Sequence, residues 1–457
     1  MLLVRWLIWR VAFFSFRQCE TLRGGQESVF VQDLKMESAS GERNIFARLK
    51  IDFSKLFPPN RRISFKSQED NWELSRKVLS EYFGLHSLEA PTSSLCPTIP
   101  NRMEYVCVMK QMEQITRLIA PEALGSSEEG KVIRGIDIGT GYTGIYALLA
   151  AKVYGFAIDA IETCKEASDT AARNVESNSL AQLVTVHHSG EANSIFPSFL
   201  KYNHLFCMCN PPFYASEQEW KQPFTCKATA PHSQITGHLN EMVCTKGGEL
   251  AFIQQMLQES QQPFMQKRIV WYSCMVSKKA TLRSLDTSQV ACWLEVEFCF
   301  ASGGTRRWIA LWTWWKQFSD FKMTDVKCIF VHGKRKGEVQ EKLVRKLKEI
   351  DLWSGNADNE VIESDRIVVC IEQVTWNRAY RRGKRIKPLQ EAAFEVAIAV
   401  EETFDAHSII SICPLTASSS TKSPANLSNS QTFNSFYLHL QHTFTKESDL
   451  FIPTSNL

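Results

Sequence analysis

The chain has 457 residues, which is enough for two or three domains and a large hydrophobic core. Hydrophobic residues make up 44% of it, an ordinary share for a globular protein, and the formal net charge is only +3. This near-neutral charge excludes a uniformly basic chain, so any nucleic-acid-binding surface must be a local patch. The 14 cysteines are scattered without a Cys-x-x-Cys pair or zinc-ligand spacing, which predicts reduced thiols and no metal site in an intracellular protein.

Residues 1–43 form an atypical N-terminal segment. Residues 1–16 are apolar and basic without an acidic residue, but arginines interrupt this run, which is also short for a transmembrane helix. Two interpretations stay open, a signal or organelle-targeting segment or an extension upstream of a start at Met36. No other stretch is long and apolar enough to span a bilayer.

Residues 44–118 predict two helices joined by a proline-containing loop. The spacing of apolar residues from Asp70 to Phe83 is typical of a capped amphipathic helix, which Gly84 ends. The prolines of Cys96-Pro-Thr-Ile-Pro-Asn-Arg102 predict a loop that carries Arg102. A second helix is expected from Tyr105 to Ile119.

Residues 131–316 alternate between strand-like and helix-like segments, which predicts a mainly parallel sheet. The first strand, 131–138, leads into the turn Gly139-Thr-Gly141-Tyr-Thr-Gly144, and a helix over 145–154 follows. Glycines between a strand and a helix allow a tight turn and the close approach of a ligand to the backbone. Gly139 and Gly141 are therefore candidate cofactor-binding residues.

Two acidic residues near this turn favour a particular cofactor. The next predicted strand, 155–158, ends in Asp159, eighteen positions after Gly141, where a carboxylate can accept hydrogen bonds from a ribose diol. These features fit either a dinucleotide or S-adenosylmethionine. Asp137, two positions before Gly139, favours S-adenosylmethionine, because a carboxylate there can face the cationic amino-acid part of that cofactor.

Asn210-Pro211-Pro212-Phe213 is the second motif with chemical meaning. It follows the apolar run 204–208, which predicts a buried strand. The Asn210 side-chain oxygen and the Pro211 carbonyl can each accept one hydrogen of a planar amine. The prolines end the strand, and Phe213 offers a flat face for stacking. The alternative is an Asn-Pro turn that closes a core strand. The position of this motif at the end of a strand that follows the glycine turn is further support for S-adenosylmethionine as the cofactor.

The rest of this region completes the predicted domain. Residues 214–240 are polar and without periodicity, which indicates an active-site lid. A strand over 267–276 is followed by Lys278 and Lys279, which could meet phosphates, and 294–300 with 308–314 predict a closing hairpin. His187 and His188 do not indicate a metal site, because adjacent residues of a strand point to opposite faces.

A small α+β accessory domain is expected over residues 319–416. It combines strands at 328–331 and 366–376 with an amphipathic helix over 338–350. The following loop, 377–387, holds six basic residues and no acidic one, among them Arg378, Arg381, Arg382, Lys384 and Arg385. This loop indicates nucleic-acid binding, with a nuclear-localisation cluster or a solvated hairpin tip as alternatives. Residues 417–457 are rich in Ser, Thr and Asn and are predicted to be disordered.

Six motifs in the same order resemble those of the eukaryotic methyltransferases that modify adenine N6 in U6 small nuclear RNA, and their bacterial relatives acting on large-subunit ribosomal RNA. The segments are Cys96-Pro-Thr-Ile-Pro-Asn-Arg102, Arg134-Gly-Ile-Asp-Ile-Gly-Thr-Gly141, Phe206-Cys-Met-Cys-Asn-Pro-Pro-Phe213, Gly247-Gly-Glu-Leu250, Trp271-Tyr-Ser-Cys-Met275 and Thr305-Arg-Arg-Trp308. The resemblance covers about residues 60 to 320. It implies a Rossmann-like S-adenosylmethionine-dependent methyltransferase domain over 119–318, after a helical RNA-binding extension over 44–118.

The resemblance also implies residue roles. Arg102 would contact the cofactor carboxylate, Gly139 and Gly141 would form its binding turn, and Asp159 would hold the ribose. Asn210 to Phe213 would clamp a flipped adenine beside the cofactor. The RNA would be a U6-type or messenger RNA hairpin on a basic face, for which the candidates are Lys278, Lys279, Arg307 and the five residues of the 377–387 loop named above. Such a substrate implies residence in the nucleus, with the cytoplasm as a further location.

Two alternative functions stay open. A methyltransferase of protein glutamine could use the same clamp for a planar amide, but Phe213 in place of the usual tyrosine and the basic loop favour nucleic acid. An RNA-binding protein could instead keep the pocket and act without catalysis through partners.

Overall fold

The computed structural model describes most of the chain between residues 51 and 445. The described residues are 51–58, 61, 63–65, 67–125, 132–190, 194–198, 203–221, 237–244, 247–299, 306–319, 321–331, 333–352, 366–371, 373–376, 387–388, 394–402, 408–415 and 431–445. Of the sequence-based expectations, those on residues 1–43, on much of the 214–240 segment, and on Arg378, Arg381, Arg382, Lys384 and Arg385 lie outside these residues.

A seven-stranded sheet with the order β3-β2-β1-β4-β5-β7-β6 forms the first unit. Five strands are parallel, and the hairpin of β6 and β7 adds antiparallel pairing at one edge. The strands are β1 Arg134–Ile138, β2 Ala157–Glu162, β3 Val184–His188, β4 His204–Cys209, β5 Ile269–Val276, β6 Cys292–Cys299 and β7 Arg306–Thr313. The predicted α/β fold with a mainly parallel sheet and a closing hairpin is confirmed.

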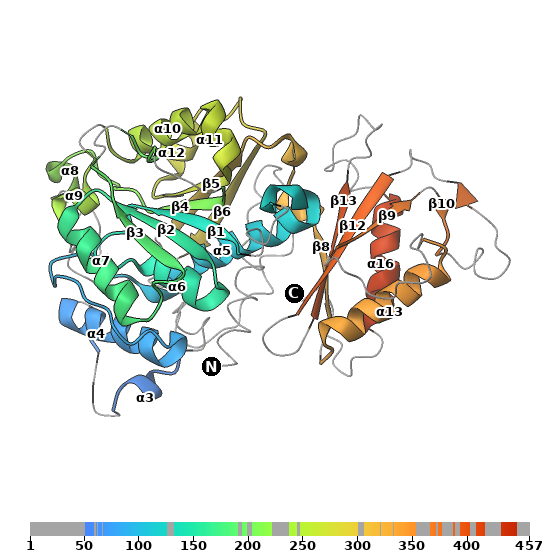
Figure 1. The fold of residues 1–457 in the computed structure, drawn as a ribbon, viewed down its shortest axis with the longest axis horizontal. Helices are drawn as coiled ribbons and strands as arrows, with labels where there is room; N and C mark the ends of the chain where they lie inside the picture. Colours follow the sequence, from blue (N-terminus) through green and yellow to red (C-terminus); the bar gives the residue numbers. More distant parts are fainter. Residues whose placement is uncertain are drawn as a thin grey trace.

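Helices cover both faces of this sheet (Figure 1). Along β4 the side chains alternate between two cores, with Phe206 and Met208 in one and Cys207 and Cys209 in the other. Burial on both faces explains why this central strand is a continuous apolar run. The covering helices are α5 Ile99–Ile119, α6 Ile145–Tyr154, α7 Lys165–Ser177, α10 Gly248–Ser260, α11 Pro263–Arg268 and α12 Lys279–Ser284. Helix α4 Gln68–Val78 packs on the short elements before and after it.

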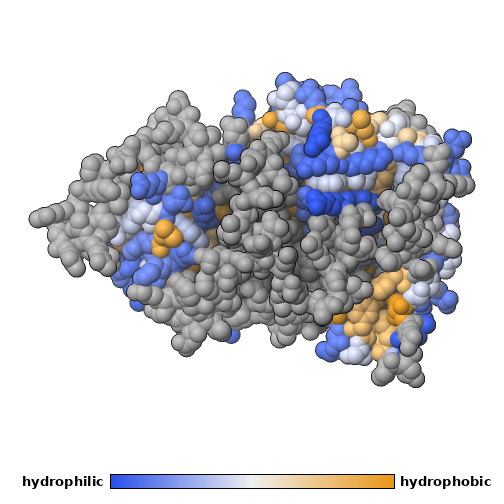
Figure 2. All heavy atoms as spheres, turned by 180° about the vertical axis from the view of Figure 1, so that it is seen from behind, coloured by the Kyte–Doolittle hydropathy of each residue, from blue (hydrophilic) through white to orange (hydrophobic). Residues whose placement is uncertain are grey.

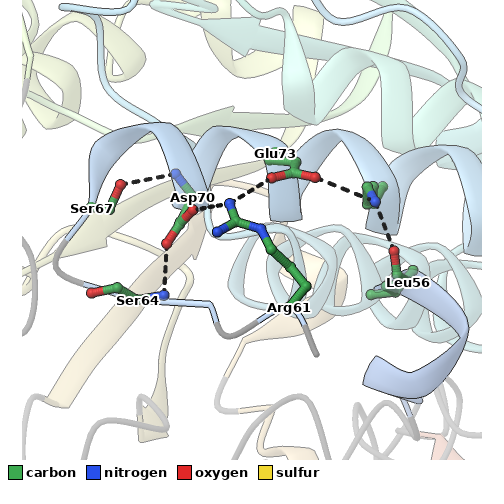
Figure 3. Close-up of polar contacts among 7 residues, drawn as sticks. Leu56, Arg61, Ser64, Ser67, Asp70 and Glu73 are labelled. Carbon is green, nitrogen blue, oxygen red and sulfur yellow. Dashed lines mark hydrogen bonds and ion pairs between the residues drawn. The ribbon is translucent and has the colours of Figure 1, made fainter. Parts of the chain in front are cut away.

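Short helices complete the unit, and a polar network fixes its N-terminal part (Figure 3). Arg61 contacts both Asp70 and Glu73 of α4, and the Ser67 hydroxyl caps that helix. Lys77 links α4 to the carbonyl of Leu56 in α3 at 2.8 Å. The short elements are α3 Phe53–Leu56, a π turn Leu79–Phe83, 3-10 turns Pro121–Leu124, Lys316–Phe318 and Met323–Asp325, and helices α8 Glu217–Lys221 and α9 Leu239–Met242.

Helix α5 begins earlier than the sequence suggested. The prolines of residues 96–102 indicated a loop, but α5 starts at Ile99 and includes Arg102. Pro100 is compatible with this start because a proline in the first helical turn lacks only an amide that would be unpaired there. Arg102 is therefore held by a rigid helix and not by a loop.

The second unit is a four-stranded antiparallel sheet with the order β8-β13-β12-β9. Its strands are β8 Lys327–Val331, β9 Arg366–Ile371, β12 Phe394–Glu402 and β13 Ser408–Leu415, with a short pair of β10 Gln373–Val374 and β11 Lys387–Pro388 beside it. Helices α13 Lys336–Glu349 and α16 Gln431–Thr445 pack on this sheet and share one hydrophobic core with it (Figure 1).

Helix α16 corrects the expectation of a disordered tail over 417–457. Phe433, Phe436, Leu440 and Phe444 are at most 3% exposed and lie in the core of the second unit. Trp376 packs on Phe436 with 5.2 Å between ring centroids. The Ser, Thr and Asn content of the tail hid a helix whose buried apolar residues recur three to four positions apart, which is the spacing of a buried helical face.

Truncating one of these aromatic residues should destabilise the second unit. Phe436→Ala removes a fully buried ring and is expected to cost about 3–5 kcal/mol. Leu438 on the same helix is 58% exposed, so Leu438→Ala should change stability by less than about 0.5 kcal/mol. Hydrogen exchange of the β8 and β13 amides measures the stability of the second unit in both variants. Equal exchange in the two variants would contradict the packing of α16.

The second unit docks on the C-terminal half of α5. Apolar contacts join Leu118 of α5 to Ala397, Ala399 and Cys413 of the sheet. The Arg366 guanidinium donates to the Leu118 carbonyl at 2.7 Å, and Gln114 hydrogen-bonds Glu401, whose pKa is raised by burial at this interface. With 21 residues, α5 is about 30 Å long, so one rigid helix carries Arg102 near its start and this docking surface near its end.

Membrane-spanning helices and metal-binding clusters are both absent from the described part of the chain. No helix there is long and apolar enough to cross a membrane, and no group of three or more His, Cys, Asp or Glu side chains there is arranged to hold a metal ion. From behind, the described surface is hydrophilic over wide areas, with a compact apolar area at its lower right (Figure 2).

Candidate active site

The Asn-Pro-Pro-Phe motif lies at the carboxyl end of β4, between β1 and β5. Asn210 Oδ1 is buried and has no hydrogen-bond partner among the described residues. Pro211 is buried and Phe213 is half-buried. A buried acceptor without a donor costs free energy in a folded protein. The oxygen is therefore placed to accept a hydrogen bond from a ligand, as the sequence suggested for an amine.

Tyr105 of α5 fixes the backbone directly before this motif. Its hydroxyl accepts a hydrogen bond from the Cys209 amide at 3.2 Å and contacts Ser273 Oγ at 2.9 Å. The ring is fully buried, and burial raises the pKa of Tyr105 well above its ordinary value, so the hydroxyl stays protonated. Residue spacing gives no sign of this role of Tyr105, because only the packing of α5 against β4 and β5 reveals it.

Glu249 is the acidic residue of the Gly-Gly-Glu-Leu motif, and it stabilises the carboxyl end of β5. It is 4% exposed and accepts hydrogen bonds from the Ser277 amide at 2.5 Å and the Thr281 hydroxyl at 2.7 Å. These bonds fix the connection from β5 to α12. Gly248 has a φ of +70°, and a Cβ on it would lie 3.0 Å from the amide nitrogen of Ala215. Gly248 therefore lets the start of α10 lie close to the backbone of Ala215, just after the Asn-Pro-Pro-Phe motif.

The glycine turn lies between β1 and α6, as predicted. Gly139 and Gly141 have φ angles of +69° and +66°, which residues other than glycine rarely adopt. The amides of Gly139 and Thr140 donate to the Ile161 carbonyl at 2.9 and 3.0 Å, and the Gly141 amide donates to Glu162 Oε2 at 2.9 Å. The turn is thus tied to the carboxyl end of β2.

Glu162, and not Asp159, is the carboxylate at the carboxyl end of β2. The sequence suggested a strand ending in Asp159, but β2 continues to Glu162. Glu162 is 9% exposed, and its carboxylate accepts hydrogen bonds from the amides of Gly141, Thr163 and Cys164 at 2.8–2.9 Å. It lies 21 positions after Gly141, so the usual spacing of about 20 residues for a ribose-binding carboxylate would also have found it.

Asp159 has a structural role in the middle of β2. It hydrogen-bonds His187 Nε2 and His204 Nε2, each at 2.7 Å. Burial would raise the pKa of Asp159, but the hydrogen bonds and charges of the two histidines lower it below its ordinary value. The geometry therefore favours Glu162 over Asp159 for the ribose, because β2 continues past Asp159 and ends at Glu162. The ribose contact of either carboxylate stays a prediction.

Arg102 and Asp137 meet around Tyr146 of α6. The Arg102 guanidinium donates to the Tyr146 hydroxyl at 2.7 Å and lies 5.3 Å from the centre of its ring. Its Nε atom is buried without a partner among the described residues. Asp137 is fully buried, and its Oδ2 accepts a hydrogen bond from the Thr140 hydroxyl at 2.6 Å, whereas Oδ1 is also without a partner in the described part of the chain.

These unpaired atoms fit the amino-acid end of S-adenosylmethionine. Arg102 Nε is a cationic donor suited to a carboxylate, and Asp137 Oδ1 is an acceptor suited to an ammonium group. Glu162 stands beyond the glycine turn, where a ribose diol would follow. The residues present therefore match the cofactor that the sequence indicated, with Glu162 in place of Asp159.

Asp137 should make cofactor affinity depend on pH. Burial raises the pKa of Asp137 from 3.8 to about 7, and the hydrogen bond from Thr140 offsets only part of this effect. A cationic ligand requires the ionised form, so the apparent Kd for the cofactor should fall about fivefold to tenfold between pH 6 and 7.5. Calorimetry in buffers of different ionisation enthalpy should show proton release on binding at pH 6.5.

Asp137→Asn is the control for this prediction. The variant should bind cofactor weakly at every pH and release no proton. Because folding raises this pKa, the cofactor-free wild-type protein should lose stability as the pH rises from about 4 to 7. The asparagine variant should lack that part of the pH dependence. A wild-type Kd that is constant with pH would contradict the role of Asp137.

The predicted RNA-binding residues fall in three places. The Arg307 guanidinium on β7 lies 5.4 Å from the centre of the Phe213 ring, and burial lowers its pKa, so it belongs to the Asn-Pro-Pro-Phe site. Lys278 is exposed after β5 and pairs with Glu219 of α8 at 3.0 Å, and Lys279 is exposed at the start of α12. The other five lie outside the described residues, so the RNA contacts of all eight stay a prediction.

The strand order, the glycine turn and the strand-end motif together define the fold of an S-adenosylmethionine-dependent methyltransferase. A family model described as RNA methyltransferase matches residues 54–316, which is more than half of the chain. The chain belongs to this RNA methyltransferase family.

Named relatives agree with this assignment. The chain is 34% identical over 261 residues to the zebrafish (Danio rerio) "RNA N(6)-adenosine-methyltransferase mettl16", covering 55% of this chain and 51% of that protein. It is 32% identical over 266 residues to the "U6 small nuclear RNA (adenine-(43)-N(6))-methyltransferase" of Drosophila pseudoobscura, covering 55% and 81%. The chain thus spans about half the length of its vertebrate relatives.

A solved structure is also similar to this chain. It is described as the hMettl16 catalytic domain in complex with MAT2A 3′UTR hairpin 1, with 33% sequence identity and a TM-score of 0.47. The match covers 55% of this chain and 82% of that one.

Proposed function

We propose that this protein transfers a methyl group from S-adenosylmethionine to the N6 amine of an unpaired adenosine in a structured RNA. The observation that carries this proposal is the buried Asn210 Oδ1 at the end of β4 beside β1, which has no hydrogen-bond partner in the described part of the chain. An acceptor in that position suits an amine that donates hydrogen bonds. The names of the relatives, which specify adenosine N6 in RNA, support the same reaction.

The chain's contribution to the reaction is alignment. The lone pair of the adenine amine is delocalised into the ring, which makes the nitrogen a poor nucleophile. Asn210 Oδ1 and the Pro211 carbonyl, accepting one amine hydrogen each, favour a pyramidal nitrogen with its lone pair directed at the methyl group. When bound, S-adenosylmethionine supplies a methyl group that its cationic sulfonium already activates. Positioning therefore contributes most of the rate, and no general base is needed before transfer.

Phe213 and Arg307 define the place of the base. The guanidinium 5.4 Å from the ring centre restricts the orientation of the Phe213 ring, on which a flipped adenine can stack. An adenine reaches this place only when it is unpaired, which favours loops and bulges of RNA. A U6-type hairpin or a messenger RNA hairpin meets this requirement. A nuclear location is part of the proposal, supported by this class of substrate and by the basic residues of the 377–387 loop.

The proposal is tested with the full chain, labelled S-adenosylmethionine and a U6-type hairpin. Nucleoside analysis should find the label only as N6-methyladenosine, and a hairpin with guanosine in place of the unpaired adenosine should stay unlabelled. Tight hairpin binding without label would overturn the enzyme in favour of a binding protein. Label on a glutamine-containing peptide, and none on RNA, would overturn the choice of substrate class.

A further inference from the structure

Residues 237–243, here called the strap, connect three parts of the active site that are far apart in sequence. The Gly237 amide donates to the Ser93 carbonyl at 3.0 Å, which ties the strap to the loop before α5. The His238 ring lies 5.2 Å from the ring of Tyr142 in the glycine turn. At its other end, the Met242 carbonyl accepts a hydrogen bond from the Tyr214 amide at 3.0 Å, directly after the Asn-Pro-Pro-Phe motif.

The Glu241 side chain adds two further hydrogen bonds that hold the strap in this position. Its Oε2 atom accepts hydrogen bonds from the His238 amide at 2.7 Å and the Leu95 amide at 3.2 Å. The first bond closes the turn of α9, and the second crosses to the loop that precedes Arg102. A single carboxylate thus joins two segments 146 residues apart.

The second oxygen of Glu241 faces the glycine turn. A Cβ placed on Gly141 would have Glu241 Oε1 as its nearest neighbour, at 3.9 Å. The Gly141 amide itself is bound to Glu162, the carboxylate at the end of β2. The strap therefore lies against the glycine turn, and the carboxylates of Glu241 and Glu162 are both close to Gly141.

We propose that Glu241 is a positioning residue that latches the strap over the cofactor pocket. This inference rests on the proposed function, because it assumes an adenosine-containing cofactor at the glycine turn. The latch has two consequences. It closes the pocket between the loop at Leu95 and the turn at Gly141, and it couples that closure to Tyr214 beside the base site. Neither sequence spacing nor the matched motifs assign this role to Glu241.

The first measurement is the affinity of the full chain for S-adenosylhomocysteine, which needs no RNA and no turnover. Glu241→Ala should weaken binding by about tenfold, the effect of losing one or two charge-assisted hydrogen bonds at the pocket. Glu241→Gln keeps an acceptor oxygen and should restore most of the affinity. Glu176→Ala removes an exposed carboxylate of α7 and is the matched control, with unchanged affinity expected.

Hydrogen exchange of the cofactor-free protein supplies the second measurement. The Leu95 amide should exchange at least about tenfold faster in Glu241→Ala than in wild type, with the glutamine variant between them. Faster exchange of the Cys244 amide, which donates to the Tyr214 carbonyl at 2.8 Å, would show that the release extends to the base site. Unchanged affinity together with unchanged Leu95 exchange would overturn the latch. A wild-type protein that fails to bind S-adenosylhomocysteine would instead count against the proposed function, while the exchange result still tests the latch.

Discussion

Replacing Asn210 by alanine is expected to slow methyl transfer by about 100-fold to 1000-fold, the range seen when one preorganised hydrogen-bonding group of an active site is removed. The side chain provides a buried acceptor that is unpaired in the described part of the protein. Without it, only the Pro211 carbonyl would hold the amine, and the nitrogen would lose its alignment with the methyl group. Single-turnover transfer to an RNA hairpin at saturating cofactor measures this effect directly.

Two further variants separate the chemistry from loss of folding. Asn203 lies just before the first residue of β4, at the opposite end of the strand, and is exposed, so Asn203→Ala should transfer methyl groups at the wild-type rate. Asn210→Asp keeps acceptor oxygens and should retain more activity than Asn210→Ala. Thermal unfolding should be similar for all three. A wild-type rate in Asn210→Ala would remove the basis of the proposed amine clamp.

The second large effect distinguishes the two carboxylates of β2. Glu162→Ala is expected to weaken S-adenosylhomocysteine binding by about 10-fold to 100-fold, because hydrogen bonds to a charged group contribute roughly 1.5–3 kcal/mol. The same substitution removes the acceptor of the Gly141, Thr163 and Cys164 amides. Part of the loss would therefore come from a less ordered glycine turn. Isothermal calorimetry measures the affinity, and Glu162→Gln should fall between the alanine variant and wild type.

Asp159→Asn is the matched comparison on the same strand. Asp159 lies three positions earlier and bonds His187 and His204. The variant should lower the free energy of unfolding at neutral pH, because folding lowers the pKa of Asp159 and so stabilises its ionised form. That stabilisation is lost in wild type as the pH falls through the acidic range. Cofactor affinity should stay within about twofold of wild type, and a large loss in Asp159→Asn alone would restore the original assignment.

The sequence alone was sufficient for features that depend on local pattern. Alternating strands and helices predicted the parallel sheet, and the glycine turn appeared where it was expected, because positive φ angles require particular residues. The motif at residues 210–213 indicated a strand end because prolines cannot continue a ladder. The buried run before it was also clear, since a central strand covered on both faces has to be apolar throughout.

Tertiary structure decided what depends on where elements end and what they pack against. Only the full length of β2 separates Glu162 from Asp159, and only the start of α5 at Ile99 places Arg102 on a helix. Helix α16 forms within a polar tail because its four buried side chains fit the core of the second sheet. The roles of Tyr105 and Glu241 arise from contacts across more than 100 residues. Local spacing cannot reveal such contacts, because they depend on how the whole chain folds.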